Sequence, residues 1–292
     1  EPCRGTFGSN AQGATYGFFK FRDYFNSRQL VTLATYHNLL SEVRSQILND
    51  SGGDSTYTDA VVTLIGLALS RLLDFASTLC WWRSDSETTR GLFVRQAIPM
   101  TWDYVEVNLF GPLVNLQKAI GWVTDSLRAL PVDSKTGKAT QLDATQALMN
   151  VDMPIVITDP PYYDNMSYAD LSDYFYVWLR RSIGYLYADL FSTVLTPKQP
   201  ELIAESNRFG GDRKKAEKHF EDGLRKTFTL IRHQSHPDYP FILYYAFKQE
   251  ELGGSGSIGR APISTGWGTM LRGLLDAGFQ ITGTWPVRTE QQ

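Results

Sequence analysis

An apolar run followed at once by two prolines constrains this chain more than any other stretch. Ile155, Val156 and Ile157 form the run, and Asp159-Pro160-Pro161-Tyr162 follows it. Consecutive β-branched residues favour a strand. Each proline fixes φ and lacks the N–H that a sheet ladder needs, so the strand must end there and the loop must be stiff. The sequence therefore predicts a buried strand that presents a rigid polar tetrapeptide at its tip.

Strand and helix signals alternate from about Lys138 onwards, which indicates a mainly parallel sheet. A short candidate strand ends at Asp143, residues 241–247 read as a central strand, and residues 279–285 read as a last strand. Three helices are predicted from apolar side chains at spacings of three and four residues: Leu171, Tyr174, Phe175, Trp178 and Leu179; Ala216, Phe220, Leu224, Phe228 and Ile231; and Trp267, Met270, Leu271, Leu274 and Leu275. Gly278 is placed just after the last of them, as its C′ residue.

The earlier part of the chain favours helices. Asn26 or Ser27 caps a predicted helix whose apolar side is Leu30, Leu33, His37, Leu40 and Ile47. A second helix, from about Thr58 to Leu79, is apolar nearly all round; its most apolar part is interrupted by polar residues and too short to cross a bilayer, so it reads as buried. We predict an α/β fold in two parts: a mainly helical accessory region at residues 1–130 and an α/β catalytic portion at residues 131–292.

Charge and cysteine content exclude several classes of protein. The net charge is −3 over 292 residues, so any contact with nucleic acid must come from a local basic face. Cys3 and Cys80 are too few for a disulfide framework or a zinc site, which suggests a reducing cytoplasm. The four histidines have no metal-ligand spacing, and we predict no metal and no membrane association.

The tetrapeptide suits the methylation of an amino group. A nucleobase amino nitrogen is a poor nucleophile because its lone pair is delocalised into the ring. The Asp159 carboxylate and the Pro160 carbonyl can each accept one N–H, while the Tyr162 ring stacks on the base and Pro161 stiffens the loop. The alternative is an ordinary strand-to-turn exit. A place at the carboxyl end of a parallel strand, where open α/β sheets bind ligands, favours the functional interpretation.

Further candidates for binding nucleic acid lie beside the motif and in one basic stretch. Tyr163 and Asn165 follow the tetrapeptide directly. The basic stretch contains Arg208, Arg213, Lys214, Lys215 and Lys218. Its side chains can contact phosphates once a target base is extruded. A solvated helix start, neutralised by neighbouring acids, explains the same charges equally well.

The motif and its flanks resemble one protein family. Residues 159–180, DPPYYDNMSYADLSDYFYVWLR, are similar to a segment of large adenine-specific DNA methylases that contain a zinc ribbon. Similar stretches are Phe7–Gly13 continuing to Phe25–Leu30, and Gly266–Met270 continuing to Ala277–Phe279 and Trp285–Glu290. The likeness covers most of the chain. It implies a Rossmann-like methyltransferase sheet, S-adenosylmethionine as methyl donor, and Asp159, Pro160 and Tyr162 as the residues that hold the target base.

Two departures from the family change the expectation. The zinc-ribbon cysteines are absent, and so is the Phe-x-Gly-x-Gly turn through which such enzymes hold the methionine part of the donor. Because that turn lies upstream in the family, we expect this chain to be the carboxyl-terminal portion of a longer enzyme, with the upstream remainder as its partner and an incomplete sheet. Asp143 and Asp159 are the candidate donor-binding residues here; a loop cap explains Asp143 equally well.

The leading hypothesis is a cytoplasmic S-adenosylmethionine-dependent DNA methyltransferase that acts on the 6-amino group of adenine. One alternative keeps the chemistry and changes the substrate to the 4-amino group of cytosine in DNA, or to a base in RNA. Another, from a different class, is a non-catalytic module for nucleic-acid binding or assembly, since the glycine turn is missing.

Overall fold

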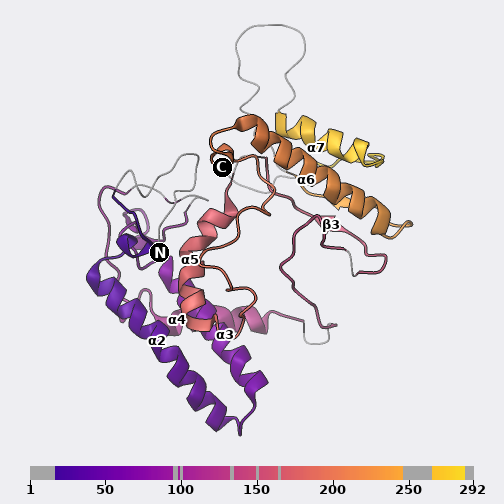
Figure 1. Cartoon of the computed structure of the whole chain (residues 1–292). Helices are drawn as coiled ribbons and strands as arrows, with labels where there is room; N and C mark the ends of the chain where they lie inside the picture. The colour runs from indigo at the N-terminus through magenta and orange to yellow at the C-terminus, as the bar shows by residue number, and fades with distance from the viewer. Residues whose placement is uncertain are drawn as a thin grey trace. The chain divides into compact units, whose positions relative to one another are not determined.

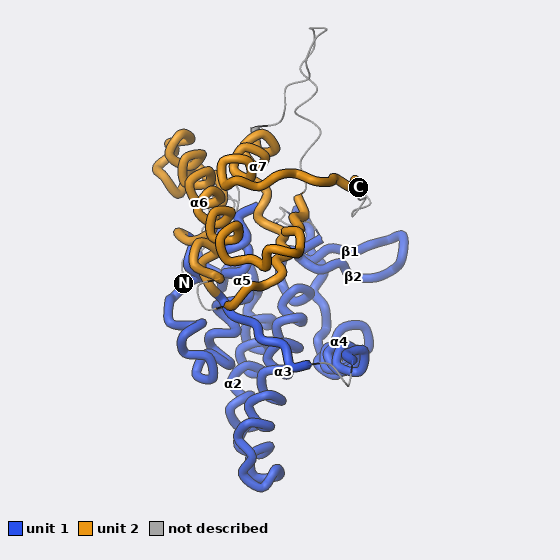
Figure 2. The backbone as a smooth tube through the Cα atoms, turned by 90° about the vertical axis from the view of Figure 1, so that its right-hand side faces the viewer, with its two compact units in different colours: residues 1–141, 166–198 blue, residues 142–165, 199–292 orange. Residues whose placement is uncertain are grey.

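The structure is a computed structural model that describes residues 17–94, 98, 101–131, 135–148, 151–163, 166–245 and 265–286. Helices make up about half of it, and the described strands form two small sheets of two strands each. The chain divides into two units (Figure 2): unit 1 comprises residues 1–141 and 166–198, and unit 2 comprises residues 142–165 and 199–292. Each unit has its own cluster of buried apolar side chains.

Unit 1 is built around a helical hairpin. Its elements are η1 (Phe21–Tyr24), α2 (Ser27–Asp50), α3 (Ser55–Leu73), β1 (Trp81–Arg83), β2 (Thr88–Arg90), α4 (Leu116–Arg128) and α5 (Tyr168–Ile183). The predicted start of α2 is confirmed: the Asn26 side chain accepts the N–H of Gln29 at 2.9 Å, and the Gln29 side chain accepts the N–H of Asn26 at 2.9 Å. A tight turn then reverses the chain, so that α2 and α3 run antiparallel (Figure 1).

Helix α3 ends earlier than predicted, at Leu73 rather than Leu79. The reason lies at Asp74, whose backbone carbonyl accepts the N–H of Leu92 at 2.7 Å and whose carboxylate accepts the N–H of Phe93 at 3.0 Å. Arg71 also pairs with this carboxylate at 2.8 Å. Asp74 therefore fixes the returning chain where the helix would otherwise continue.

The expectation that this apolar helix is too short for a bilayer needs correction. By length and composition alone, α3 is the one described helix that meets the requirement for a membrane span. In unit 1 it packs against α2, α4 and α5, and Val62, Leu69 and Leu72 are almost completely buried. Gly66 lets α5 approach closely, since a Cβ there would lie 2.9 Å from the Ile183 side chain.

Helix α5 follows the tetrapeptide in sequence and belongs to unit 1 by contact. Its predicted apolar face is confirmed, with Leu171, Tyr174 and Trp178 buried. The Tyr174 hydroxyl donates to the carbonyl of Leu73 at 2.9 Å and so ties α5 to the end of α3. Helix α5 lies within residues 131–292, the predicted catalytic portion, yet its contacts assign it to unit 1. The predicted boundary at residue 131 therefore does not coincide with the boundary between the two units, and it stays a prediction about function.

Unit 2 joins two parallel strands to a pair of helices. Its elements are β3 (Ile157–Thr158), η2 (Ser206–Phe209), α6 (Arg213–Gln234), β4 (Ile242–Leu243) and α7 (Thr265–Asp276). Strands β3 and β4 are parallel, with Ile157 opposite Ile242 and Thr158 opposite Leu243. Helices α6 and α7 pack side by side (Figure 1). The predicted parallel direction is confirmed for this pair, while a Rossmann-like sheet is neither shown nor excluded.

Several strand predictions are wrong for residues of unit 2 and for the residues that precede it in the sequence. Residues 135–143 form no strand, so none ends at Asp143, and residues 279–286 form none either. The motif strand is short, and it is not buried: Ile155 and Ile157 are 55% and 61% exposed. Val156, between them, packs on the side chains of the α6 and α7 cluster. One face of the parallel pair is thus covered, and the other is open.

Candidate functional site

The tetrapeptide lies at the carboxyl end of the parallel pair. Asp159 directly follows Thr158, the last residue of β3, and Tyr244 follows the last residue of β4. The backbone N–H of Tyr244 donates to the carbonyl of Thr158 at 2.9 Å, which keeps the two strand ends in register. Because parallel strands end at the same edge, the motif and residues 244–245 lie together there, as the sequence predicts for the motif.

The Asp159 carboxylate is exposed and has one described side-chain partner. Its Oδ1 accepts the hydroxyl of Tyr162 at 3.0 Å. Across the part of the chain that the structure describes, no donor is assigned to Oδ2 or to the carbonyl of Pro160. Tyr162 therefore orients the carboxylate, while Oδ2 of Asp159 and the carbonyl oxygen of Pro160 remain as acceptors at the strand end.

Aromatic rings surround this edge. The Tyr162 ring meets the Tyr245 ring edge-on, with centroids 5.7 Å apart and an interplanar angle of 89°. Tyr245 in turn stacks on Trp267 of α7 at 5.9 Å. Gly266 makes this approach possible, because a Cβ there would lie 3.1 Å from the Tyr245 hydroxyl. The sequence does not single out Tyr245 or Trp267 as site residues, since nothing local links either of them to the tetrapeptide.

Tyr163 points into the core of unit 2. Its ring contacts the Phe220 ring of α6 edge-on at 5.2 Å, and its carbonyl accepts the N–H of Ala204 at 2.8 Å. Its φ of +37° is unusual for a residue with a side chain and places local strain directly after the motif. The predicted contact with nucleic acid through Tyr163 stays untested, and Asn165 lies outside the described residues.

Asp143 caps a turn. Its Oδ1 accepts both the backbone N–H and the hydroxyl of Thr145, at 2.8 and 2.7 Å. This is the loop-cap arrangement that the sequence offered as the alternative, and the donor-binding role of Asp143 stays a prediction.

Acidic neighbours pair with most of the basic stretch. Arg208 and Glu201 form an ion pair at 2.6 Å in which each side chain is only 12% exposed, so this arginine is committed within unit 2. Along α6 the pairs are Arg213 with Glu217, Lys215 with Asp212, and Lys218 with Asp222. Lys214 is exposed and has no ion-pair partner among the described residues. The arrangement favours the neutralised helix start over a dense phosphate-binding patch.

Arg213 nevertheless connects the basic stretch to the motif. The hydrogen bond to Glu217 raises the pKa of its guanidinium, and the Tyr163 side chain raises it further. Of the predicted nucleic-acid contacts, Tyr163 and Arg213 are therefore neighbours in unit 2, while Tyr162 contacts Asp159 and Tyr245. No group of three or more potential metal ligands occurs in the described residues.

Comparison with known proteins adds no identification. A scan against protein-family models gave no match, and searches of curated proteins and of solved structures gave none either. The likeness to zinc-ribbon adenine methylases rests on the sequence stretches alone, and its functional content is a proposal.

Proposed function

We propose that this chain carries the target-base site of an S-adenosylmethionine-dependent DNA methyltransferase that acts on the 6-amino group of adenine. One observation carries the proposal. An exposed carboxylate, oriented by a tyrosine hydroxyl 3.0 Å away, lies at the carboxyl end of a parallel strand pair beside stacked aromatic rings.

The residues present fit an amino group. An exocyclic NH₂ has two N–H donors, and Asp159 and the Pro160 carbonyl offer two acceptors at adjacent chain positions. Accepting a hydrogen bond from each N–H holds the nitrogen in place and favours localisation of its lone pair. The Tyr162 ring, already packed edge-on against Tyr245, supplies a surface on which an extruded base can stack.

The fit to the methyl donor is partial. Asp159 and the half-buried Asp143 are the acids proposed to face it, and the glycine turn of the family is absent from the sequence. S-adenosylmethionine, when bound, supplies an electrophilic methyl group to the amine. In this proposal the upstream remainder of the enzyme completes the donor site, while the residues of this chain hold the amine and let its proton pass to solvent or to Asp159.

Replacing Asp159 tests the proposal. In the full-length protein, Asp159→Ala removes one of the two acceptors and is expected to lower the methylation rate at least about 100-fold, as for other oriented hydrogen-bonding groups in active sites. Tyr162→Phe keeps the ring and removes the hydroxyl that orients the carboxylate, so a smaller loss of about tenfold is expected. The rate is measured by mass spectrometry of nucleosides after incubation with S-adenosylmethionine and DNA.

Asp152→Ala is the matched control, because Asp152 is an exposed acid just before β3 and outside the motif. Circular dichroism of each variant checks folding. Near-normal methylation by Asp159→Ala would contradict the mechanism. Parallel incubations with RNA, and the identity of the modified nucleoside, distinguish adenine from cytosine and DNA from RNA. Absence of methylation and of donor binding in the wild-type protein would favour the non-catalytic module.

A further inference from the structure

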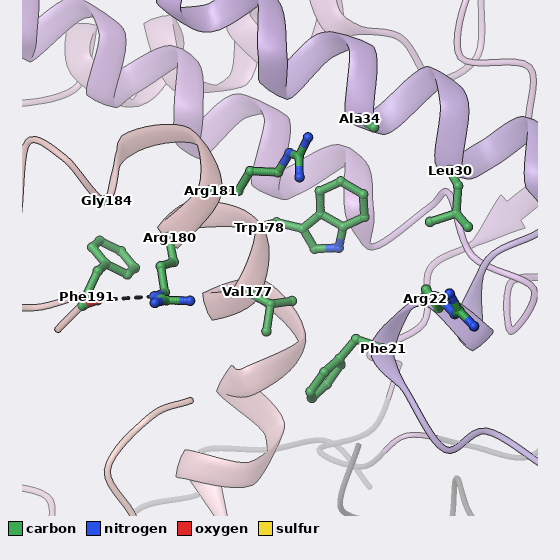
Figure 3. Close-up of a pocket in the computed structure, with 10 residues that line it drawn as sticks. All are labelled: Phe21, Arg22, Leu30, Ala34, Val177, Trp178, Arg180, Arg181, Gly184 and Phe191. Atoms are coloured by element: carbon green, nitrogen blue, oxygen red, sulfur yellow. Dashed lines mark hydrogen bonds between the residues drawn. The ribbon is translucent and has the colours of Figure 1, made fainter. Parts of the chain in front are cut away.

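We propose that a pocket in unit 1 binds an organic phosphate, with the phosphate on its arginines and the organic body against its apolar wall. The pocket has a volume of about 610 Å³ and lies between η1, the first half of α2 and the end of α5 (Figure 3). That volume suits a ligand of nucleotide size. No residue of the tetrapeptide lines it, so the proposal does not rest on methyl transfer.

The charge of the lining is of one sign. Arg22, Arg180 and Arg181 line the pocket, and none of its described lining residues carries a carboxylate. A concave site lined by one sign of charge concentrates ligands of the opposite sign. Guanidinium groups present planar donors that match phosphate oxygens, often two bonds at a time. The lining therefore selects an anion.

Two of these guanidinium groups have no close bidentate carboxylate among the described residues to neutralise their charge. Arg181 donates through Nε and Nη2 to Oδ1 of Asn38, at 3.2 and 2.8 Å, and this partner is neutral. Arg22 has its Nε 3.7 Å from Oδ1 of Asp23, and its side chain is 70% exposed. The other carboxylate oxygen of Asp23 is held by two backbone N–H groups. Among the described residues, neither arginine has the close bidentate carboxylate that neutralises Arg28 at Glu106.

Trp178 adds a further donor and an apolar surface. Its ring projects from α5 toward Leu30 and Ala34 of α2 (Figure 3). The side chain is 8% exposed, and its indole N–H has no acceptor among the described residues. Phe21 contributes a second aromatic side chain to the wall. The pocket thus combines three guanidinium groups and an indole N–H with an apolar wall, which is the complement of a phosphate ester with a flat organic group.

A purely structural role explains only part of this arrangement. Arg180 and Arg181 stand in the last turn of α5, where cations offset the helix dipole, and Arg180 donates to the carbonyl of Phe191 at 3.3 Å. Arg22 comes from a different element, and the dipole of α5 does not account for it or for the indole N–H. Substitutions of Arg22 and Arg181 are therefore the ones that test phosphate binding in the pocket.

Calorimetric titration of this chain with deoxyadenosine monophosphate tests the proposal. Saturable binding is expected, weakened about tenfold by Arg22→Gln and again by Arg181→Gln, since each removes charge-assisted hydrogen bonds to the phosphate. Arg128→Gln is the matched control, because Arg128 is an exposed arginine of α4 that does not line the pocket. It should leave the affinity unchanged. Circular dichroism confirms that each variant is folded.

Three further titrations complete the test. Adenosine and inorganic phosphate should each bind more weakly than the nucleotide, because adenosine lacks the phosphate that contacts the arginines and inorganic phosphate lacks the organic group that contacts the apolar wall. A single-stranded oligonucleotide that binds with the same dependence on Arg22 and Arg181 would support the proposal and identify a nucleic-acid strand as the source of the phosphate. Absence of nucleotide binding at millimolar concentration, equal binding of adenosine, or unchanged affinity in the Arg22→Gln/Arg181→Gln variant would overturn it.

Asp159→Ala separates this pocket from the proposed base site. The substitution should leave nucleotide binding unchanged even where it abolishes methylation. Loss of nucleotide binding in Asp159→Ala would place the nucleotide at the tetrapeptide and overturn the assignment to the pocket in unit 1.

Discussion

At the scale of single residues, His37 is the least satisfied polar side chain of the α2 core. It is 3% exposed, and neither ring nitrogen has a hydrogen-bond partner among the described residues. Its ring lies 4.9 Å from the ring of Trp178. Burial, and to a lesser degree the charge of Arg181, lower the pKa of His37 from 6.5 to about 4. The folded protein therefore disfavours a protonated His37.

We expect His37 to make the protein acid-sensitive. Below pH 6.5 the unfolded chain takes up a proton that the folded chain does not, so the free energy of unfolding falls as the pH drops to about 4, by roughly 3 kcal/mol in the limit. His37→Leu has no titrating group at this position, so its free energy of unfolding should lack this part of the pH dependence. Urea denaturation of both proteins between pH 7 and pH 4 measures the difference, and identical slopes would refute the assignment to His37.

At the scale of elements, helix ends are set by local chemistry. Helix α7 ends at Asp276, and Gly278 is its C′ residue as predicted, with a φ of +84°. Its N–H donates to the carbonyl of Leu275 at 3.0 Å, and the N–H of Phe279 donates to the carbonyl of Leu274 at 3.1 Å. These two bonds form a Schellman motif, which requires the left-handed conformation at that position.

Gly278→Ala should destabilise unit 2 by about 1 kcal/mol, because alanine at positive φ is strained even though no atom crowds the site. Gly273→Ala is the control in the same helix. There the added methyl meets the Phe228 ring at 3.4 Å, and alanine gains up to about 1 kcal/mol in helix propensity, so stability should hold or rise. Hydrogen exchange of the α7 amides measures both effects; equal protection in the two variants would argue against the cap.

A second element-scale feature ties α5 to the segment after it. Asp173 is 2% exposed, and its carboxylate accepts the backbone N–H of Thr196 at 2.8 Å and the ammonium of Lys198 at 2.6 Å. The Thr196 hydroxyl also contacts the carboxylate. This single side chain holds three donors from the segment that closes unit 1.

Asp173→Ala should therefore cost unit 1 about 3 kcal/mol, since it leaves the half-buried Lys198 without its closest partner. Asp125→Ala removes an exposed carboxylate that pairs with Arg128 on α4 and should change stability by no more than about 0.5 kcal/mol. Thermal unfolding followed by circular dichroism compares them. Similar melting temperatures for the two variants would rule out a stabilising role for the Asp173 network.

At the scale of the whole molecule, the open face of the parallel pair is the least usual feature. Ile155, Ile157, Ile242 and Tyr244 are exposed on one face, while Val156 and Leu243 pack on the helices at the other. Parallel strands are almost always covered on both faces. Under the proposed function, we expect helices of the upstream remainder to pack on this exposed face.

Substitutions on the two faces test this asymmetry. In this chain, Ile157→Thr should change stability by no more than about 0.5 kcal/mol, whereas Val156→Thr should cost about 1 kcal/mol or more because it places a hydroxyl against the apolar cluster. In the longer protein that we propose, Ile157→Thr should also become costly. Urea denaturation of each variant in both contexts gives the comparison; a neutral Ile157→Thr in the longer protein would argue against a second helical layer.

Helices α2, α3, α5, α6 and α7 were predictable because their signals are local, whereas α4 was not predicted. The apolar spacing from Ala216 to Ile231 and the cap at Asn26 involve neighbours only a few residues apart. The strands were predicted less well: residues near Asp143 and after Phe279 form none, because a strand depends on a partner that the local sequence does not specify. For the same reason the sequence located the tetrapeptide and missed Tyr245 and Trp267, which reach it only through folding.

The sequence by itself determined that α2, α3, α5, α6 and α7 form and where β3 must stop, since periodicity, caps and proline geometry act between neighbours along the chain. Only the tertiary structure decided that α5 packs in unit 1, that the arginines of η1 and α5 share one pocket, and that Tyr162 donates to Asp159 at the edge formed by β3 and β4. Those arrangements join residues that are distant in sequence or select one of several side-chain orientations. Tertiary packing determines which residues meet and which orientation each side chain takes.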